Sequence, residues 1–239
     1  MSAPLVLLHG FTGSGESWND VLARIPTRTA RCPLLLGHGA RADGVRSFEG
    51  ECDRLATLFG PEPVHLGGYS LGARLALGVA VRHPERVQKL TLVGVHPGLA
   101  TDAEREERRR SDARWIELLE GCGIEAFVDA WSAQPLFSSE RKLPEAARRR
   151  RQAERLAHDP KELARSLRLL GLAEMPHFRA QLATLRLPVT LLSGELDAKF
   201  SALSEELVHA LPNARRTTVP GAGHNLLLER PDLVATELT

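Results

Sequence analysis

The chain has 239 residues, a formal net charge of +1 and three cysteines. This length suits one large α/β domain or two small ones, and the nearly neutral charge gives no reason to expect nucleic acid or an anionic membrane as a partner. The cysteines are widely spaced and form no C-x-x-C motif. They argue against a disulfide framework and a zinc site, and they suit a reducing compartment.

The N-terminal segment and the apolar runs bear on where the protein is found. The segment MSAPLVLLHG has no basic region, and its apolar run is too short for a signal peptide. No stretch approaches the ~18 apolar residues that a membrane helix requires. We therefore expect a cytoplasmic protein with no membrane insertion.

Short apolar runs bounded by glycine or proline recur through the first part of the chain. They are almost continuously apolar, as strands covered on both faces of a sheet tend to be. The runs expected to form buried strands are Leu5 to His9, Cys32 to Gly37, Val64 to Gly68 and Lys89 to Val95. Before the last of these lies a helical segment, in which apolar residues are helically spaced from Leu71 and Pro84 marks the end.

The pattern changes from about Leu99 to Thr184, where charged, alanine- and leucine-rich helical segments replace the strands. Strand-then-loop patterns return at Leu187 to Glu195 and at Arg215 to His224. Alternating strands and helices predict an α/β fold with a mostly parallel, doubly wound sheet. We expect an α/β core in residues 1–98 and 185–239, interrupted by a helical lid in residues 99–184. Such a lid would cover the edge where open parallel sheets bind ligands.

Two arginine runs fall in this helical segment, at Arg108 to Arg110 and at Arg148 to Arg151. Acidic residues are interspersed around both runs. We interpret the runs as solvated helix faces, with a basic docking patch as the alternative.

The segment GYSLG, Gly68 to Gly72, lies where a predicted strand meets a predicted helix. A G-x-S-x-G motif in that context is typical of a sharp turn that exposes a serine oxygen, here that of Ser70. Small residues at Gly68 and Gly72 leave room for the turn. The motif alone is weak, because short glycine-rich turns arise by chance. The flanking strand and helix make it more specific.

A serine hydroxyl needs an activating partner, and with this motif the chain order is serine, acid, histidine. His224, in PGAGHN after the last predicted strand, is the best placed of the nine histidines. Asp197 follows the preceding strand and can hold the imidazole in the required tautomer, with Glu195 as the local rival. His38 and His96 also follow predicted strands, and we expect turn-forming or packing roles for them.

The glycine-rich loop HGFTGSG, His9 to Gly15, follows the first predicted strand. It resembles the loop that provides amide hydrogens for developing negative charge, here from Phe11 together with Leu71, although an ordinary glycine turn is the alternative. These pieces in the correct order predict an α/β-hydrolase fold with the serine, aspartate and histidine as the catalytic set. The first strand begins near residue 5, so we expect the N-terminal strands of this fold to be shortened or missing.

Arg74 lies four residues after Ser70, so both side chains project from the same side of the predicted helix. A guanidinium stays charged, pairs bidentately with carboxylates and is costly to bury alone. Arg74 is therefore either part of a structural salt bridge or a carboxylate clamp beside the serine. The second interpretation favours an anionic substrate.

Motifs spread from His9 to Asn225 together resemble one family, the 2-succinyl-6-hydroxy-2,4-cyclohexadiene-1-carboxylate synthases of menaquinone biosynthesis. The motifs are HGFTGSGESW, GYSLGAR, SDARW, VDAWSAQPLF, GELDAKF and GAGHN. The lid motif W-x-x-Q-P-x-F and the D-x-K-F after the acid are more distinctive than the catalytic set, which many hydrolases share. Two departures remove no reacting group: Ala73 stands where glycine is expected, and LLLGHG lacks the common D-x-P-G-H-G form.

The resemblance implies a lyase and not a hydrolase. In this family the serine is understood to act as a base that removes a ring proton, so that an enolpyruvyl group leaves as pyruvate. The family's substrate, 2-succinyl-5-enolpyruvyl-6-hydroxy-3-cyclohexene-1-carboxylate, carries three carboxylates, which arginines hold. The residues that the resemblance assigns to substrate binding are Arg74, Arg114, Arg155, Trp131 and Tyr69. As alternatives, Arg114 and Arg155 could be surface charges, and Trp131 could be lid core.

The resemblance implies no cofactor, and the sequence shows neither a phosphate-binding loop nor a metal-ligating cluster. The expected partner is a small-molecule polycarboxylate, bound by a monomer or a small homo-oligomer. Two alternatives stay open. One is a serine hydrolase, a carboxylesterase or carbon–carbon bond hydrolase, that acts on a carboxylate-bearing substrate. The other is a catalytically silent binding protein on the same fold.

Overall fold

Six strands form one sheet in the computed structural model, which describes residues 3–40 and 42–239, and every neighbouring pair is parallel. β2 lies on one side of β1 and all later strands lie on the other, in the order β2-β1-β3-β4-β5-β6. This reversal creates a switch point between β1 and β3, where open α/β sheets bind ligands. The strands are β1 (Leu5–Leu8), β2 (Ala30–Arg31), β3 (Val64–Tyr69), β4 (Val87–Val93), β5 (Val189–Gly194) and β6 (Ala214–Val219).

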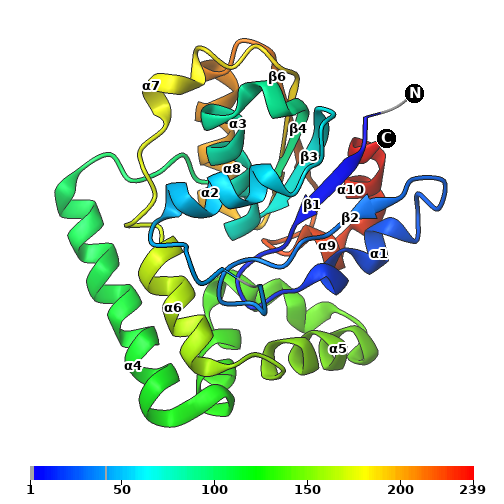
Figure 1. The fold of residues 1–239 in the computed structure, drawn as a ribbon. Coiled ribbons are helices and arrows are strands. Elements are labelled where there is room, and N and C mark those ends of the chain that lie inside the picture. Colours follow the sequence, from blue (N-terminus) through cyan, green and yellow to red (C-terminus); the bar gives the residue numbers. More distant parts are fainter. Residues whose placement is uncertain (1–2, 41) are drawn as a thin grey trace.

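Helices cover both faces of the sheet (Figure 1). The α-helices are α1 (Asn19–Leu22), α2 (Phe48–Thr57), α3 (Leu71–Arg82), α4 (Asp102–Ser132), α5 (Glu145–Leu156), α6 (Pro160–Leu170), α7 (Arg179–Leu182), α8 (Ala198–Ala210), α9 (Leu226–Glu229) and α10 (Pro231–Leu238). Three short 3-10 helices complete the set: η1 (Gly15–Trp18), η2 (Pro84–Arg86) and η3 (Pro135–Lys142). None of the helices in the described part of the chain is both long enough and apolar enough to cross a membrane.

Alternate residues of β1 enter two separate apolar cores. Val6 and Leu8 belong to the core that includes side chains of α2, α3 and α8, whereas Leu5 and Leu7 belong to the core that includes side chains of α1, α9 and α10. All four side chains are at most 1% exposed. Because helices cover both faces of the sheet, the central strands consist of almost continuous apolar runs. The predicted parallel, doubly wound sheet is confirmed.

The helices α4, α5 and α6 gather at one end of the molecule, between β4 and β5 in the chain (Figure 1). Gly123, with a φ of +82°, interrupts α4 and divides it into two helical segments. Trp115 and Trp131 lie on either side of this break, and their ring centres are 5.0 Å apart. A straight helix would separate the two residues by about 24 Å along its axis. The break at Gly123 therefore reverses the chain and brings the two tryptophans together.

The prediction of a strand over residues 32–37 is wrong. β2 covers only Ala30–Arg31 and pairs there with β1. Pro33 has no amide hydrogen, and the amide of Leu36 donates to Glu51 Oε1 at 2.9 Å. These residues thus form an apolar loop in which the amides of Leu35 and Leu36 donate to side chains. The division into a core and a lid over residues 99–184 stays a prediction, although α4 begins at Asp102.

Candidate active site

Ser70 lies in a strained turn between β3 and α3. Its φ of +53° and ψ of −108° form a conformation that a residue with a side chain adopts only under constraint. Its amide donates to the carbonyl of Val93 on β4 at 2.9 Å. Glycines permit the turn, since a Cβ on Gly68 would lie 2.3 Å from the Gly72 oxygen and one on Gly72 would lie 2.2 Å from the Leu8 oxygen. Neither position has space for a side chain, so the sharp turn depends on both glycines.

Three side chains from different strand ends meet in one hydrogen-bonded row. His224, after β6, has its Nε2 3.1 Å from Ser70 Oγ and its Nδ1 2.6 Å from Asp197 Oδ2. Asp197 follows β5 and is 8% exposed, while His224 is 3% exposed. When Nδ1–H donates to the carboxylate, Nε2 is left to accept the serine proton. The arrangement can therefore deprotonate the serine hydroxyl.

The alternative acid and histidines have other contacts. Glu195 is exposed, and its Oε2 accepts the Gly221 amide at 2.8 Å, which braces the loop that leads to the histidine. His38 Nε2 accepts the Thr12 amide at 3.1 Å and supports the glycine-rich loop. Burial lowers the pKa of His96 to about 4, so this ring is neutral near pH 7.

The loop after β1 and the start of α3 lie beside the serine. Phe11 from the loop and Leu71 from the helix line the same cavity as Ser70. Leu71 is the first residue of α3, so its amide has no carbonyl one turn back within the helix. Thr12, the next residue of the loop, has a φ of +62°. This arrangement suits an oxyanion hole, in which backbone amides face an oxygen that gains negative charge.

A cavity of about 310 Å³, here called the main cavity, lies between the strand ends and side chains of α4 and α6. Among the described residues that line it, cations outnumber carboxylates. The charged side chains are Arg74, Arg108, Lys199 and Asp112. An excess of positive charge favours an anionic ligand. No group of three or more metal-ligating side chains in the described part of the chain is arranged to hold a metal ion.

Arg74 lies one helical turn after Ser70 and lines the main cavity. Its Nη1 donates to the carbonyl oxygen of Leu170 at 2.9 Å, and no carboxylate among the described residues pairs with its guanidinium. Burial, together with the nearby charge of Arg108, lowers the pKa of Arg74 to about 9. The nearby charge of Asp112 compensates only part of this effect, so an anion bound beside Arg74 would stabilise its charged form further.

Arg108, and not Arg114, is the α4 arginine that lines the main cavity. The α4 residues on its wall have the helical spacing i, i+3, i+4, i+7: Arg108, Ser111, Asp112 and Trp115. Arg114 falls outside this phase and is exposed. Arg108 Nε donates to both carboxylate oxygens of Asp112, at 2.9 and 3.0 Å. The helical phase relative to Trp115 is the sequence signal that could have identified Arg108.

Trp131 packs among apolar side chains of α4 and α6 and also lines the main cavity. Its ring stacks on Phe127 with centres 5.4 Å apart, and it contacts Phe11 edge to face at 5.2 Å. It also lines the main cavity, and its indole N–H is buried without a hydrogen-bond partner among the described residues. A buried donor without a partner is costly, so the indole suits a contact with a polar ligand.

Arg155 and Tyr69 lie behind the wall of the main cavity. Arg155 is 3% exposed, and its guanidinium contacts Glu140 at 3.2 Å and Ser132 Oγ at 2.9 Å. It lines a neighbouring cavity of about 260 Å³. Tyr69 packs against His224 with ring centres 5.4 Å apart and borders a smaller cavity of about 100 Å³. Neither residue is among the described residues that line the main cavity, and their assignment to substrate binding stays a prediction.

Known proteins of one family match this chain over almost its whole length. The profile of the Alpha/beta hydrolase family matches residues 5–237. A protein of Bacillus subtilis (strain 168), named provisionally as a 2-succinyl-6-hydroxy-2,4-cyclohexadiene-1-carboxylate synthase, is 38% identical over 97% of this chain and 87% of its own length. The chain belongs to this synthase family, within the α/β hydrolases.

A further relative and a solved structure support this family membership. The 2-succinyl-6-hydroxy-2,4-cyclohexadiene-1-carboxylate synthase of Enterobacter sp. (strain 638) is 37% identical over 97% of this chain and 88% of its own. The structure of MenH from S. aureus superposes with a TM-score of 0.94 and 26% identity, and the match covers 100% of this chain and 92% of that one. The family resemblance and the α/β-hydrolase fold are confirmed, while the roles of single residues stay predictions.

Proposed function

We propose that this protein eliminates pyruvate from 2-succinyl-5-enolpyruvyl-6-hydroxy-3-cyclohexene-1-carboxylate to give 2-succinyl-6-hydroxy-2,4-cyclohexadiene-1-carboxylate. Membership of the synthase family supports the proposal. The observation that supports the proposal at this site is Arg74, a buried cation that lines the same cavity as Ser70 and forms no ion pair with a carboxylate among the described residues. A neutral ester would leave that cation unpaired, whereas a polycarboxylate supplies its partner.

In the proposed reaction Ser70 is the base, and His224 and Asp197 activate it. The serine oxygen removes the ring proton next to the succinyl carbonyl as His224 Nε2 takes the hydroxyl proton. The electrons of the broken C–H bond form an enolate, and they then return through the ring to break the bond to the enolpyruvyl oxygen. The departing enolpyruvate takes up a proton on carbon and becomes pyruvate.

The enolate oxygen needs donors that are in place before it forms. We assign this role to the amides of Phe11 and Leu71, which line the main cavity beside the serine. Preorganised amides stabilise developing charge without the reorganisation that water would require. Because the donors are backbone groups, the conformation of the loop after β1 controls the direction of the Phe11 amide, and the start of α3 controls that of Leu71.

The substrate carboxylates require cations, and the main cavity provides them. We assign one carboxylate to Arg74 and another to Arg108, which takes the place that the motif comparison gave to Arg114. The unpaired indole N–H of Trp131 is a further donor for a carboxylate or carbonyl oxygen. Arg155 lines the neighbouring cavity instead of the main cavity and pairs with Glu140, so we assign it to the support of the lid.

The test is to incubate purified protein with the proposed substrate and measure pyruvate. We expect stoichiometric pyruvate and cyclohexadiene, with the reaction abolished in Ser70→Ala. If the protein forms no pyruvate but cleaves an ester through a trapped acyl-serine, the hydrolase alternative replaces the proposal. If the substrate binds without turnover, equally well to wild type and Ser70→Ala, the protein is a binding protein on this fold.

A further inference from the structure

The loop that carries the proposed oxyanion donor has an unusual backbone. Thr12 follows Phe11 directly, is fully buried and has a φ of +62°, in the left-handed region that residues with a branched Cβ avoid. Such a conformation persists only where surrounding contacts hold it. The contacts of Thr12 therefore decide whether the loop keeps its shape.

The contacts of Thr12 come from two sides. On the core side, its amide donates to His38 Nε2 at 3.1 Å, and its hydroxyl donates to the carbonyl of Phe11 at 2.6 Å. On the lid side, Arg151 of α5 donates from Nη1 to the Thr12 carbonyl at 2.9 Å and from Nη2 to the Thr12 hydroxyl oxygen at 3.1 Å. A single guanidinium from the lid thus holds both acceptors of this residue.

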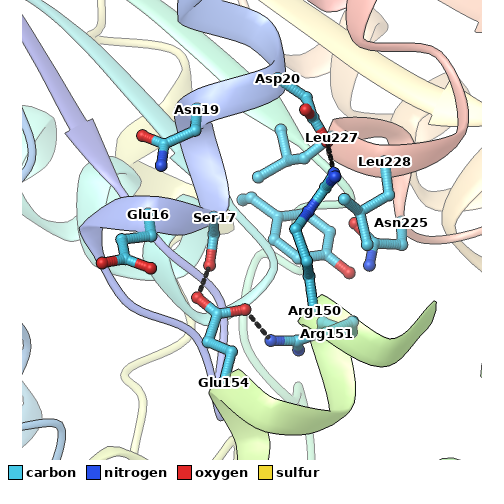
Figure 2. A pocket seen from close by; sticks show the side chains of 11 residues that line it. Glu16, Ser17, Asn19, Asp20, Arg150, Arg151, Glu154, Asn225, Leu227 and Leu228 are labelled. Carbon is cyan, nitrogen blue, oxygen red and sulfur yellow. Dashed lines mark hydrogen bonds and ion pairs between the residues drawn. The ribbon is translucent and has the colours of Figure 1, made fainter. Parts of the chain in front are cut away.

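Glu154, one turn further along α5, fixes the position of Arg151. Its Oε2 accepts from Arg151 Nη1 at 2.7 Å, while its Oε1 accepts the Ser14 amide at 2.9 Å and the Ser17 hydroxyl at 2.6 Å. Figure 2 shows the carboxylate between Ser17 on η1 and Arg151 on the lid helix. Burial alone raises the pKa of Glu154, but Arg151 and the serine hydroxyls outweigh it, and the pKa is lowered. The carboxylate is therefore charged at neutral pH.

We propose that Arg151 is a positioning residue. It couples the packing of lid helix α5 to the backbone conformation of the loop after β1, which carries Phe11 and Thr12. When α5 packs against the loop, the two hydrogen bonds from Arg151 hold Thr12. The Thr12 hydroxyl in turn holds the carbonyl of Phe11. Without them, the loop is free to relax from its left-handed conformation and the Phe11 amide loses its direction. This inference rests on the proposed function, because it takes the Phe11 amide as an oxyanion donor.

The proposal separates an effect on turnover from an effect on binding. The cations assigned to the substrate lie on α3 and α4, whereas Arg151 lies on α5 and is 7% exposed behind the loop. Loss of its contacts should therefore lower kcat and leave KM nearly unchanged. A direct substrate contact would instead raise KM, and a merely structural role would lower the amount of folded protein without changing kcat per folded molecule.

The first experiment compares steady-state kinetics of Arg151→Met, Arg151→Lys and Arg150→Met, with folded protein quantified for each. Arg150 is the matched control: it lies on the same helix and pairs with Asp20 of α1 at 2.8 Å (Figure 2), and no hydrogen bond among the described residues joins it to Thr12. We expect Arg151→Met to lower kcat about 10- to 100-fold, as for a misplaced oxyanion donor, with KM within about threefold. Arg151→Lys should recover part of kcat, and Arg150→Met should stay within about twofold.

The second experiment measures amide hydrogen exchange at Thr12 in the same variants, and it does not depend on turnover. We expect exchange at least about 10-fold faster in Arg151→Met and unchanged exchange in Arg150→Met. If Arg151→Met does not fold, both the kinetics and the exchange are measured on Arg151→Lys. We then expect a smaller loss of kcat than for the methionine variant, and faster exchange at Thr12 than in wild type. Unchanged exchange at Thr12, or a raised KM with normal kcat, would overturn the proposal. A wild-type protein that forms no pyruvate would contradict the proposed function. The exchange rate of the Thr12 amide would still show whether α5 holds the loop.

Discussion

Arg74 on α3 donates from Nη1 to the carbonyl oxygen of Leu170, the last residue of α6, at 2.9 Å. The carboxyl end of a helix carries partial negative charge, which compensates part of the cost of a buried cation. This bond orients the guanidinium and leaves its other donors without a carboxylate among the described residues. The carboxyl end of α6 therefore orients the cation that we assign to a substrate carboxylate.

Arg74→Met should weaken substrate binding more than it slows the chemical step. A hydrogen bond to a charged group contributes about 1.5–3 kcal/mol, so we expect KM to rise about 10- to 100-fold. Initial-rate measurements of pyruvate release over a wide substrate range check this. A KM within twofold of wild type would show that Arg74 is not a carboxylate ligand.

The lowered pKa of Arg74, to about 9, predicts a pH dependence on the alkaline side. The cation is present below that pKa and lost above it, while substrate carboxylates, with pKa values near ~4, stay ionised. We expect kcat/KM to fall as the pH rises through about 9, whereas kcat persists to higher pH because a bound carboxylate raises the pKa of the guanidinium. The pH profile of Arg74→Met should lack this alkaline fall. A wild-type profile that is flat to pH ~10 would contradict the assignment.

The assignment of a carboxylate to Arg108 can be compared directly with Arg114 on the same helix. Glutamine at position 108 removes the charge but keeps an amide donor for Asp112, which is 5% exposed and would otherwise be left unpaired. We expect Arg108→Gln to raise KM about 10-fold and Arg114→Gln to change it less than about twofold. Equal effects, or a larger effect at Arg114, would restore the assignment made from motif position.

Buried histidines predict a loss of stability in mild acid. Burial lowers the pKa of His9 to about 4, and burial with the neighbouring His9 holds that of His38 well below its ordinary value. Between these pKa values and about 6.5 the unfolded chain binds more protons, so stability present at pH 7 is lost as the pH falls. Each fully affected histidine costs about 2 kcal/mol at pH 5.

Urea denaturation at pH 7 and pH 5 measures this loss. His9→Gln keeps a donor for the Gly10 carbonyl and an acceptor for the Leu35 amide, the two contacts of the imidazole. It should reduce the difference in unfolding free energy between the two pH values by about 2 kcal/mol. An identical difference in wild type and His9→Gln would show that His9 protonates in the folded protein.

Local patterns located the sheet and the groups at its edge well. Ser70, Asp197 and His224 each lie within five residues after the end of a strand. The carboxyl ends of parallel strands meet at one edge of the sheet, so sequence position alone implies proximity. The failed strand at 32–37 shows the limit of this reasoning. An apolar run does not reveal that Leu36 donates its amide to a side chain, Glu51, which reaches it from α2.

The arginine runs were harder to interpret, because each contains one inward residue among exposed ones. Arg109 and Arg110 are exposed while Arg108 lines the main cavity, and Arg148 to Arg150 are exposed while Arg151 is buried. Which member of a run faces inward depends on the phase of its helix. For α4 and α5 that phase is set by the packing of each helix against the rest of the molecule, which composition does not reveal.

The most direct test of the account is pyruvate release from the proposed substrate by wild type and by Ser70→Ala, with substrate affinity measured for both. If Ser70 is the base, the variant should lose at least about 10³-fold in kcat, because it lacks the oxygen that removes the ring proton. Its dissociation constant should stay within about threefold of wild type, since the cations that bind the carboxylates are intact. Pyruvate release that continues at the wild-type rate in Ser70→Ala would contradict the account.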